Sequence, residues 1–287
     1  MNNILLRLFL ILLIFGGVGG LVFVGTPADG NTLLFEAALL IFGIQLAVFL
    51  PSYGLQTEHY FDLTGGLTYL SVMSYMAYQH QLIIGQWDLR SIVLTTLIAF
   101  WAVRLSSFLF TRVMRVGKDG RFDRLKTSFT RFMLTWILQG LWVFICTYPA
   151  LIVLVSPAET EVFYLILGSS LWLLGWGYEV VADRQKTRFN KQPNNAGKFI
   201  NIGLWKQSRH PNYVGEFVLW TGITIIAIPV FEGGQWCALI TPFFVYFLLT
   251  KVSGVNLLEE RADLKWGDDP AYQAYKKQTP VFFPKLF

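Results

Sequence analysis

Cysteine, histidine and charged residues are scarce in this chain of 287 residues. It has two cysteines and three histidines, and Asp, Glu, Lys and Arg together make up only 14% of it. Cys146 and Cys237 both lie in apolar runs, so neither a disulfide framework nor a cysteine-based metal site is indicated. His59, His80 and His210 are too scattered along the chain to suggest a metal centre. We therefore expect no metal.

The motifs of soluble nucleotide-binding proteins are also missing. The chain has no Walker-type glycine-rich loop and no Gly-x-Gly-x-x-Gly motif after a strand, which excludes the two standard soluble nucleotide folds. The formal net charge is +5, with 23 Lys and Arg against 18 Asp and Glu. These basic residues gather between apolar runs and not on a water-facing surface that could bind nucleic acid. No nucleic-acid partner is expected.

What the chain has in abundance is apolar sequence. Hydrophobic residues make up 54% of it, and the mean hydropathy of +0.49 is typical of a protein that lies in lipid. A transmembrane helix needs about 20 mostly apolar residues. Runs near that length predict an all-α, polytopic membrane helix bundle, with spans at Ile4–Val24, Leu33–Leu50, Leu63–Ile84, Ile92–Phe110, Phe132–Val155, Val162–Val181, Tyr213–Phe231 and Trp236–Lys251.

The number of spans is predicted as seven or eight. The last two runs are short and are joined by a tight turn at residues 232–235, so they could instead form a re-entrant pair. The first run is longer than the 7–15 apolar residues of a signal peptide, and we expect it to be retained. With no internal repeat and no Pro-rich linker, the simplest organisation is one integral membrane domain over residues 1–287.

The distribution of Lys and Arg predicts the orientation in the membrane. Residues 111–131 and 183–211 hold fourteen of the 23 basic residues, whereas residues 25–32, 156–161 and 232–235 hold none. Eight spans would place both basic loops and both termini in the cytoplasm. The polar loop at 51–62 then faces the cytoplasm as well, and it is a candidate catalytic segment.

Ionisable residues inside predicted spans are costly to bury and suggest function. Arg104, Glu179 and Glu216 are of this kind. Glu179, Asp183 and Lys186 are spaced i, i+4 and i+7, so they share one face of a helix that continues from the membrane into water. This face could bind ribose or amide groups and present a cation to phosphates. An ordinary surface ladder of charges is the alternative.

The segment at 203–216 is the densest set of polar and special-backbone residues in the chain. Pro211 suits the first position of a helix, and Ser208, Arg209 and His210 precede it. Free backbone N–H groups and a guanidinium would therefore converge at a helix start, which favours an anion. Gly215 would permit the close approach of a ligand or of a neighbouring helix.

Three blocks of this sequence together resemble the steroid 5-alpha-reductase family, and above all its bacterial branch of uncharacterised membrane proteins, the DUF1295 family. The stretch from Trp101 through Arg104 to Phe122 also looks like that branch. The resemblance covers about residues 90–287, whereas residues 1–90 share only the hydropathy profile and a Gln-x-Glu pattern. The blocks are Glu179…Ala182-Asp183…Gln185-Lys186…Phe189, Gly203-Leu-Trp205…Ser-Arg-His-Pro-Asn-Tyr-Val-Gly-Glu216 and Tyr272…Tyr275…Pro284.

The resemblance implies an enzyme of the bacterial inner membrane that reduces a carbon–carbon double bond in a lipid-like substrate with NADPH. The substrate would be a steroid-like enone or another unsaturated lipid that enters from the bilayer among membrane lipids. The cofactor would bind in the part of the chain from about residue 100 to 287. By position in the motifs, the cofactor-binding residues would be Arg104, Glu179, Asp183, Asn212 and Glu216, with Arg209, His210 and Tyr213 added through proximity.

The catalytic residues of the family carry over less completely. In eukaryotic reductases a glutamate follows a glutamine in the first long loop, and a tyrosine lies three residues before the helix arginine. Here Gln56 is followed by Thr57 and then Glu58, and the tyrosine position is Trp101. An indole donates one hydrogen bond but is no useful acid. Either another group, such as Glu58, His59, Tyr53 or Tyr60, is therefore the acid, or the substrate is not a steroid enone. Glu58 would need a raised pKa to be the acid.

Two other functions stay open on the sequence. Membrane methyltransferases of the isoprenylcysteine carboxyl methyltransferase type also carry an Arg-His-Pro-x-Tyr-x-Gly element followed by a Glu-Glu pair, as Arg209–Gly215 and Glu259-Glu260 do here. Such an enzyme would use S-adenosylmethionine. A transporter or a structural membrane protein is less favoured, because the polar groups gather at one end of the spans and no repeat is evident.

Overall fold

A computed structural model describes residues 2–85, 88–156, 158–252 and 254–285. All secondary structure assigned in these residues is helical. Seven helical segments are long and apolar enough to cross a membrane. The prediction of an all-α, polytopic bundle is therefore confirmed. The chain divides into two compact units, residues 1–165 with 226–239 and residues 166–225 with 240–287, and each is described by itself. A single domain stays a prediction.

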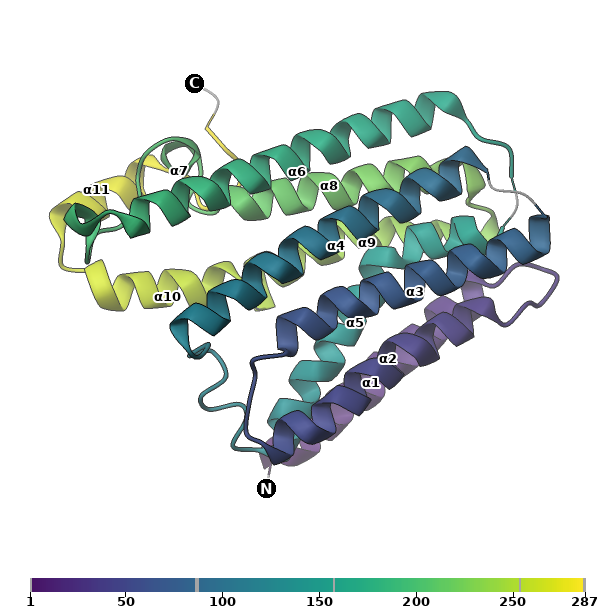
Figure 1. The fold of residues 1–287 in the computed structure, drawn as a ribbon, viewed down its shortest axis with the longest axis horizontal. Helices are drawn as coiled ribbons and strands as arrows, with labels where there is room; N and C mark the ends of the chain where they lie inside the picture. The colour runs from purple at the N-terminus through teal and green to yellow at the C-terminus, as the bar shows by residue number, and fades with distance from the viewer. Residues whose placement is uncertain (1, 86–87, 157, 253, 286–287) are drawn as a thin grey trace. The chain divides into compact units, whose positions relative to one another are not determined.

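The first unit is built around one buried helix. It contains α1 (Asn2–Gly25), α2 (Leu33–Gly54), α3 (Phe61–Ile84), α4 (Leu89–Val116) and α5 (Phe129–Val155), followed later in the chain by the short helices η2 (Ile228–Val230) and η3 (Gly233–Leu239). Helix α5 packs against α1, α2, α3 and α4. Its side chains from Val143 to Val155 are all buried, because it is apolar on every face and is enclosed by its neighbours (Figure 1).

The second unit centres on two helices that touch along their backbones. It contains most of α6 (Val162–Lys191), then η1 (Pro193–Asn195), α7 (Leu204–Gln207), α8 (Pro211–Ala227), α9 (Ile240–Phe247), the π-helix η4 (Leu248–Val252), α10 (Val255–Trp266) and α11 (Pro270–Gln278). Helices α6 and α8 run side by side in Figure 1. Gly175 meets Gly215, and Gly168 meets Gly222 one heptad away. Small residues at this spacing let membrane helices approach closely.

Most predicted spans coincide with helices, with two differences. Helix α3 is 24 residues long but is not among the seven helices that are apolar enough to span, because Thr, Gly, Gln and His dilute its apolar residues. The span predicted over Trp236–Lys251 lies within one of the seven candidate membrane spans, Gly233–Trp266, but it is not one continuous α-helix. This part of the chain is divided into η3, α9 and η4, since Pro242 lacks an N–H group and fits only the first turn of a helix.

Candidate functional site

Three acidic side chains are buried where α6 and α8 adjoin in the second unit. Glu179 and Asp183 lie on α6 and are 2% and 8% exposed, and Glu216 on α8 is 8% exposed. As predicted, α6 continues as one helix to Lys191, and α8 begins at Pro211. Buried carboxylates are retained only where they are compensated. Their burial supports a functional interpretation over a solvent-exposed ladder of charges.

Gly215 places these acids through backbone contact. A Cβ atom at Gly215 would lie 2.5 Å from Gly175 O and 2.6 Å from Glu179 N. No larger side chain fits at that distance, so the glycine serves the approach of α6. Of the two roles predicted for it, contact with a neighbouring helix is the one observed.

Arg209 and His210 share one carboxylate of α10. Arg209 Nη1 lies 2.5 Å from Glu259 Oε2, and His210 Nε2 lies 2.8 Å from Glu259 Oε1. The His210 ring also stacks on Tyr213 in the first turn of α8, with the planes inclined by 11°. Glu259 therefore fixes both residues of the predicted anion site and neutralises part of the charge of Arg209.

Three buried side-chain atoms of this group have no hydrogen-bond partner among the described residues: His210 Nδ1, Arg209 Nε and Arg209 Nη1. Of these, Arg209 Nη1 is ion-paired with Glu259. Burial lowers the pKa of His210, and Glu259 only partly opposes that effect. A neutral His210 that donates Nε2–H to Glu259 leaves Nδ1 as a bare acceptor. A buried acceptor and a buried donor, each without a partner, are suited to a polar ligand.

The residues around Trp205 place a second cation, Lys186, near enough to His210 for its charge to act on that ring. The Trp205 indole donates to Ala182 O at 3.0 Å, and Lys186 Nζ lies 4.4 Å from the centre of its ring. Gln185 Oε1 accepts from Leu204 N at 2.9 Å. Gly203 adopts a φ of +60°, and a Cβ there would lie 2.6 Å from the Gln185 amide. The Gly-Leu-Trp block therefore holds Lys186 in place.

The C-terminal tail packs on the same segment. Tyr275 OH donates to Trp205 O at 2.6 Å, and Pro280 O accepts from Arg209 N at 2.9 Å. Tyr272 is buried and donates to Asp263 Oδ1 at 3.2 Å. Burial raises the pKa of both phenols, so they stay protonated as donors. The three sequence blocks thus belong to one structural group in the second unit.

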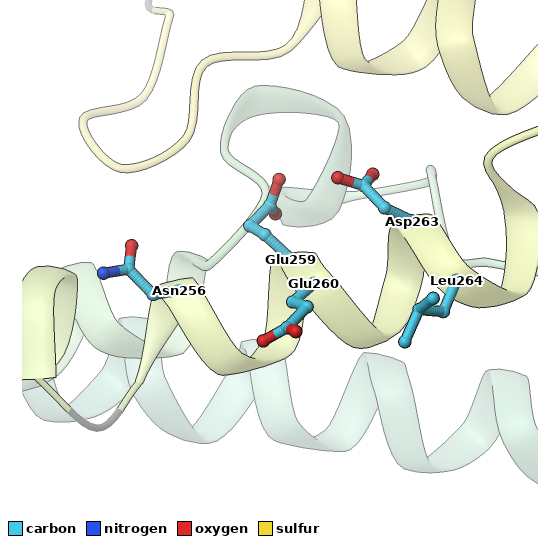
Figure 2. A pocket seen from close by; sticks show the side chains of 5 residues that line it. All are labelled: Asn256, Glu259, Glu260, Asp263 and Leu264. Carbon is cyan, nitrogen blue, oxygen red and sulfur yellow. The ribbon is translucent and has the colours of Figure 1, made fainter.

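An open hollow of about 580 Å³ lies along α10. Figure 2 shows that Glu259 and Asp263 project from one side of the helix, whereas Glu260 and Leu264 project from the other. Asn256 completes the lining. Three carboxylates repel anions, so this hollow does not favour a phosphate group.

Four of the predicted site residues lie in the first unit. Gln56 and Glu58 are in the loop between α2 and α3, and Trp101 and Arg104 are on α4. Gln56 is exposed, has a φ of +51° and donates to Tyr53 O. The Arg104 guanidinium lies 5.3 Å from the centre of the Phe108 ring. The grouping of Arg104 with the second-unit residues stays a prediction.

Glu58 does not have the properties expected of an acid. Its carboxylate is 2.6 Å from Lys126 Nζ and accepts from Asp119 N at 3.0 Å. Burial opposes ionisation, but these hydrogen bonds and the charge of Lys126 outweigh it and lower the pKa of Glu58. Glu58 therefore lacks the raised pKa that the role of acid would require. Glu58 is a carboxylate that joins the 51–62 loop to the 111–131 loop.

Trp101 is 2% exposed and meets Tyr69 of α3 edge to face, at 5.3 Å between ring centres. Tyr69 and Lys126 carry no sequence motif and are not predicted from the sequence. Glu259 is predicted only as part of a Glu-Glu pair. That pair is the signal that could have identified Glu259 as the partner of Arg209 and His210.

The fold and the site define a class: a polytopic α-helical membrane protein with buried polar residues between two closely packed helices. A family model described as a protein of unknown function, DUF1295, matches residues 48–279. The chain belongs to the DUF1295 family. No curated protein matches it.

Proposed function

We propose that this protein is a membrane-embedded, NADPH-dependent reductase of a carbon–carbon double bond in a lipid. The observation that carries the proposal is the pair of buried, unsatisfied atoms His210 Nδ1 and Arg209 Nε. They adjoin Lys186, whose charge acts on His210. The family resemblance of the three sequence blocks, all of which lie in the second unit, supports the choice of ligand.

The residues of the second unit fit a dinucleotide. Lys186 and Arg209 are cations suited to phosphate groups. His210 Nδ1 would accept from a hydroxyl or an amide, and the buried Glu179, Asp183 and Glu216 offer further acceptors for ribose and carboxamide groups. NADPH, when bound, supplies a hydride. The chain's own residues would hold and orient it, and the apolar helices would keep water from the reacting atoms.

The test is a titration of cofactor binding in purified protein. The thermal unfolding temperature is measured in detergent with increasing NADPH, for the wild type and for Asp183→Ala and Asn212→Ala. A ligand at about 100 times its Kd stabilises the folded state by about 2.7 kcal/mol. Both variants should unfold near the wild-type temperature without ligand and should need at least tenfold more NADPH for the same stabilisation.

Asn190→Ala is the matched control, because Asn190 is an exposed residue in the last part of the same helix, α6. It should bind NADPH as the wild type does. Near-native NADPH affinity in both Asp183→Ala and Asn212→Ala would refute this cofactor site.

A methyltransferase that uses S-adenosylmethionine is the second candidate. One observation favours it: the acidic hollow along α10 lies beside the Arg209–His210–Glu259 group, and carboxylates suit the sulfonium and ammonium charges of that cofactor. Stabilisation by S-adenosylmethionine, and loss of that stabilisation in Glu260→Gln, would support this alternative over the reductase.

A further inference from the structure

Helix α6 has an exposed apolar side, opposite its contact with α8. Ile166, Leu174 and Val181 are all exposed, whereas Gly175 meets the backbone of α8. Leu174 follows Ile166 at i+8 and Val181 follows it at i+15, so the three share one side of the helix. Because α6 is long and apolar enough to span a membrane, this exposed apolar side is in contact with lipid.

The same side of the helix becomes basic where the apolar run ends. Arg184, Arg188 and Lys191, here called the basic stripe, are exposed. They follow Val181 at i+3, i+7 and i+10, which keeps them on its side of the helix. The buried acid Glu179 lies five residues before Arg184, about 140° around the helix. The basic stripe therefore continues the lipid-facing side and is separate from the face that carries Glu179.

The charges of the basic stripe are not compensated by the described part of the chain. Residues 184–215 contain no Asp or Glu, and none of the three cations forms an ion pair with a described residue. Arg184 and Arg188 are spaced i, i+4, where like charges destabilise a helix. The helix dipole favours Arg188 and Lys191 in the last turn, but its effect does not extend to Arg184. An external anion would relieve this repulsion.

The length of α6 places the basic stripe at the level of lipid headgroups. The residues from Val162 to Val181 extend about 30 Å at a rise of about 1.5 Å per residue, which equals the thickness of the hydrocarbon core. The headgroup region adds about 5–8 Å on each side. Arg184 lies about 5 Å beyond Val181 and Arg188 about 11 Å, and a long arginine side chain reaches back toward the interface.

We propose that the basic stripe binds the headgroups of anionic phospholipids in the adjacent leaflet. The guanidinium groups of Arg184 and Arg188 suit phosphate oxygens, and the acyl chains would lie against the exposed apolar side of the same helix. Basic clusters next to a membrane span attract anionic lipids in this way. The positive-inside rule alone would account for basic residues in this loop, but it does not require them to share the lipid-facing side. That alignment carries the proposal.

The test measures the lipid selectivity of the full chain in detergent. A fluorescent phosphatidylglycerol is bound to the protein and displaced by phosphatidylglycerol, by phosphatidylcholine with the same acyl chains, or by inorganic phosphate. Each basic side chain near an anionic surface contributes about fivefold in affinity, so we expect a preference for phosphatidylglycerol over phosphatidylcholine of at least about tenfold. Salt should remove most of this preference at about 0.5 M, and inorganic phosphate should not displace the probe.

The variant that removes the basic stripe, with Arg184→Gln, Arg188→Gln and Lys191→Gln together, should retain a preference of less than about twofold. Arg184→Gln alone should lower the preference about fivefold, which keeps the test open if the triple variant does not fold.

The matched control removes the same charge elsewhere in the second unit, with Arg261→Gln, Lys277→Gln and Lys285→Gln together. These three residues are also exposed. The control should keep the preference of the wild type.

Several results would overturn the site. A wild type without preference for phosphatidylglycerol does so, as does a preference that high salt leaves unchanged. An equal loss in the control would assign the effect to overall charge, and displacement by inorganic phosphate would assign the stripe to a free anion. Light scattering on the same samples covers a protein partner: a dimer that dissociates when the stripe is removed, with no lipid preference, would assign the stripe to a second copy.

Discussion

The contact between α6 and α8 is most directly tested by adding one methyl group, in Gly215→Ala. The new Cβ would lie 2.5 Å from Gly175 O, 2.6 Å from Glu179 N and 2.9 Å from Glu179 Cβ. Two of these atoms belong to the backbone of α6, which cannot rotate away. The helices must therefore separate, and Glu179 moves with α6.

The expected magnitude combines two opposing effects. Alanine is favoured over glycine in a helix by about 1 kcal/mol, whereas overpacking a tight contact costs about 1–3 kcal/mol. Gly177→Ala separates them, because Gly177 lies on the same helix as Gly175 and a Cβ there meets nothing within 4 Å. Relative to Gly177→Ala, we expect Gly215→Ala to be less stable by about 1–3 kcal/mol.

The assay is reversible unfolding of both variants in mixed micelles, with helix content as the readout. Gly215→Ala should also bind NADPH more weakly, since the contact positions Glu179. Equal stability of Gly215→Ala and Gly177→Ala would refute the reasoning, because it would mean that α6 and α8 do not touch at this point.

Two further predictions concern the first unit. Glu58→Gln should lower the free energy of unfolding by about 1–3 kcal/mol, because it removes the charge that pairs with Lys126. Asp123→Asn breaks the exposed pair with Lys118 and should change the free energy of unfolding little. Equal effects of the two variants in thermal unfolding would contradict this prediction. Burial opposes ionisation of Asp88, but hydrogen bonds with His80 and Ser91 hold its pKa well below the ordinary value. A lowered pKa gives stability that is present above about pH 4 and lost as the pH falls. Unfolding temperatures measured from pH 6 to pH 3 should therefore fall more steeply for the wild type than for Asp88→Asn. Parallel curves would mean that Asp88 does not contribute this pH-dependent stability.

Much of the fold could be predicted from the sequence because lipid imposes a simple rule. A run of about 20 apolar residues must be helical so that its backbone groups are satisfied. The start of α8 at Pro211 and the continuation of α6 beyond the apolar run were predicted correctly, since both depend on local chemistry. The broken segment after Gly233 was not, because the π-helix η4 reflects packing and leaves no periodic pattern.

The candidate site was predicted in part, for a similar reason. Arg209, His210 and Gly215 lie in one short motif, so their proximity follows from the sequence. Their partner Glu259 is 49 residues beyond His210, and Lys126 is 68 residues beyond Glu58. Pairings over such distances depend on tertiary contacts. The lowered pKa of Glu58 could not be foreseen for that reason.

The central claim, that the buried polar group of the second unit binds NADPH, is tested most directly by thermal unfolding of the purified wild type with NADPH, NADH and S-adenosylmethionine in parallel. We predict stabilisation by NADPH of about 2.7 kcal/mol at about 100 times its Kd, and no stabilisation by S-adenosylmethionine. Stabilisation by S-adenosylmethionine and none by NADPH would contradict the account and would assign Arg209, His210 and Glu259 to a methyltransferase.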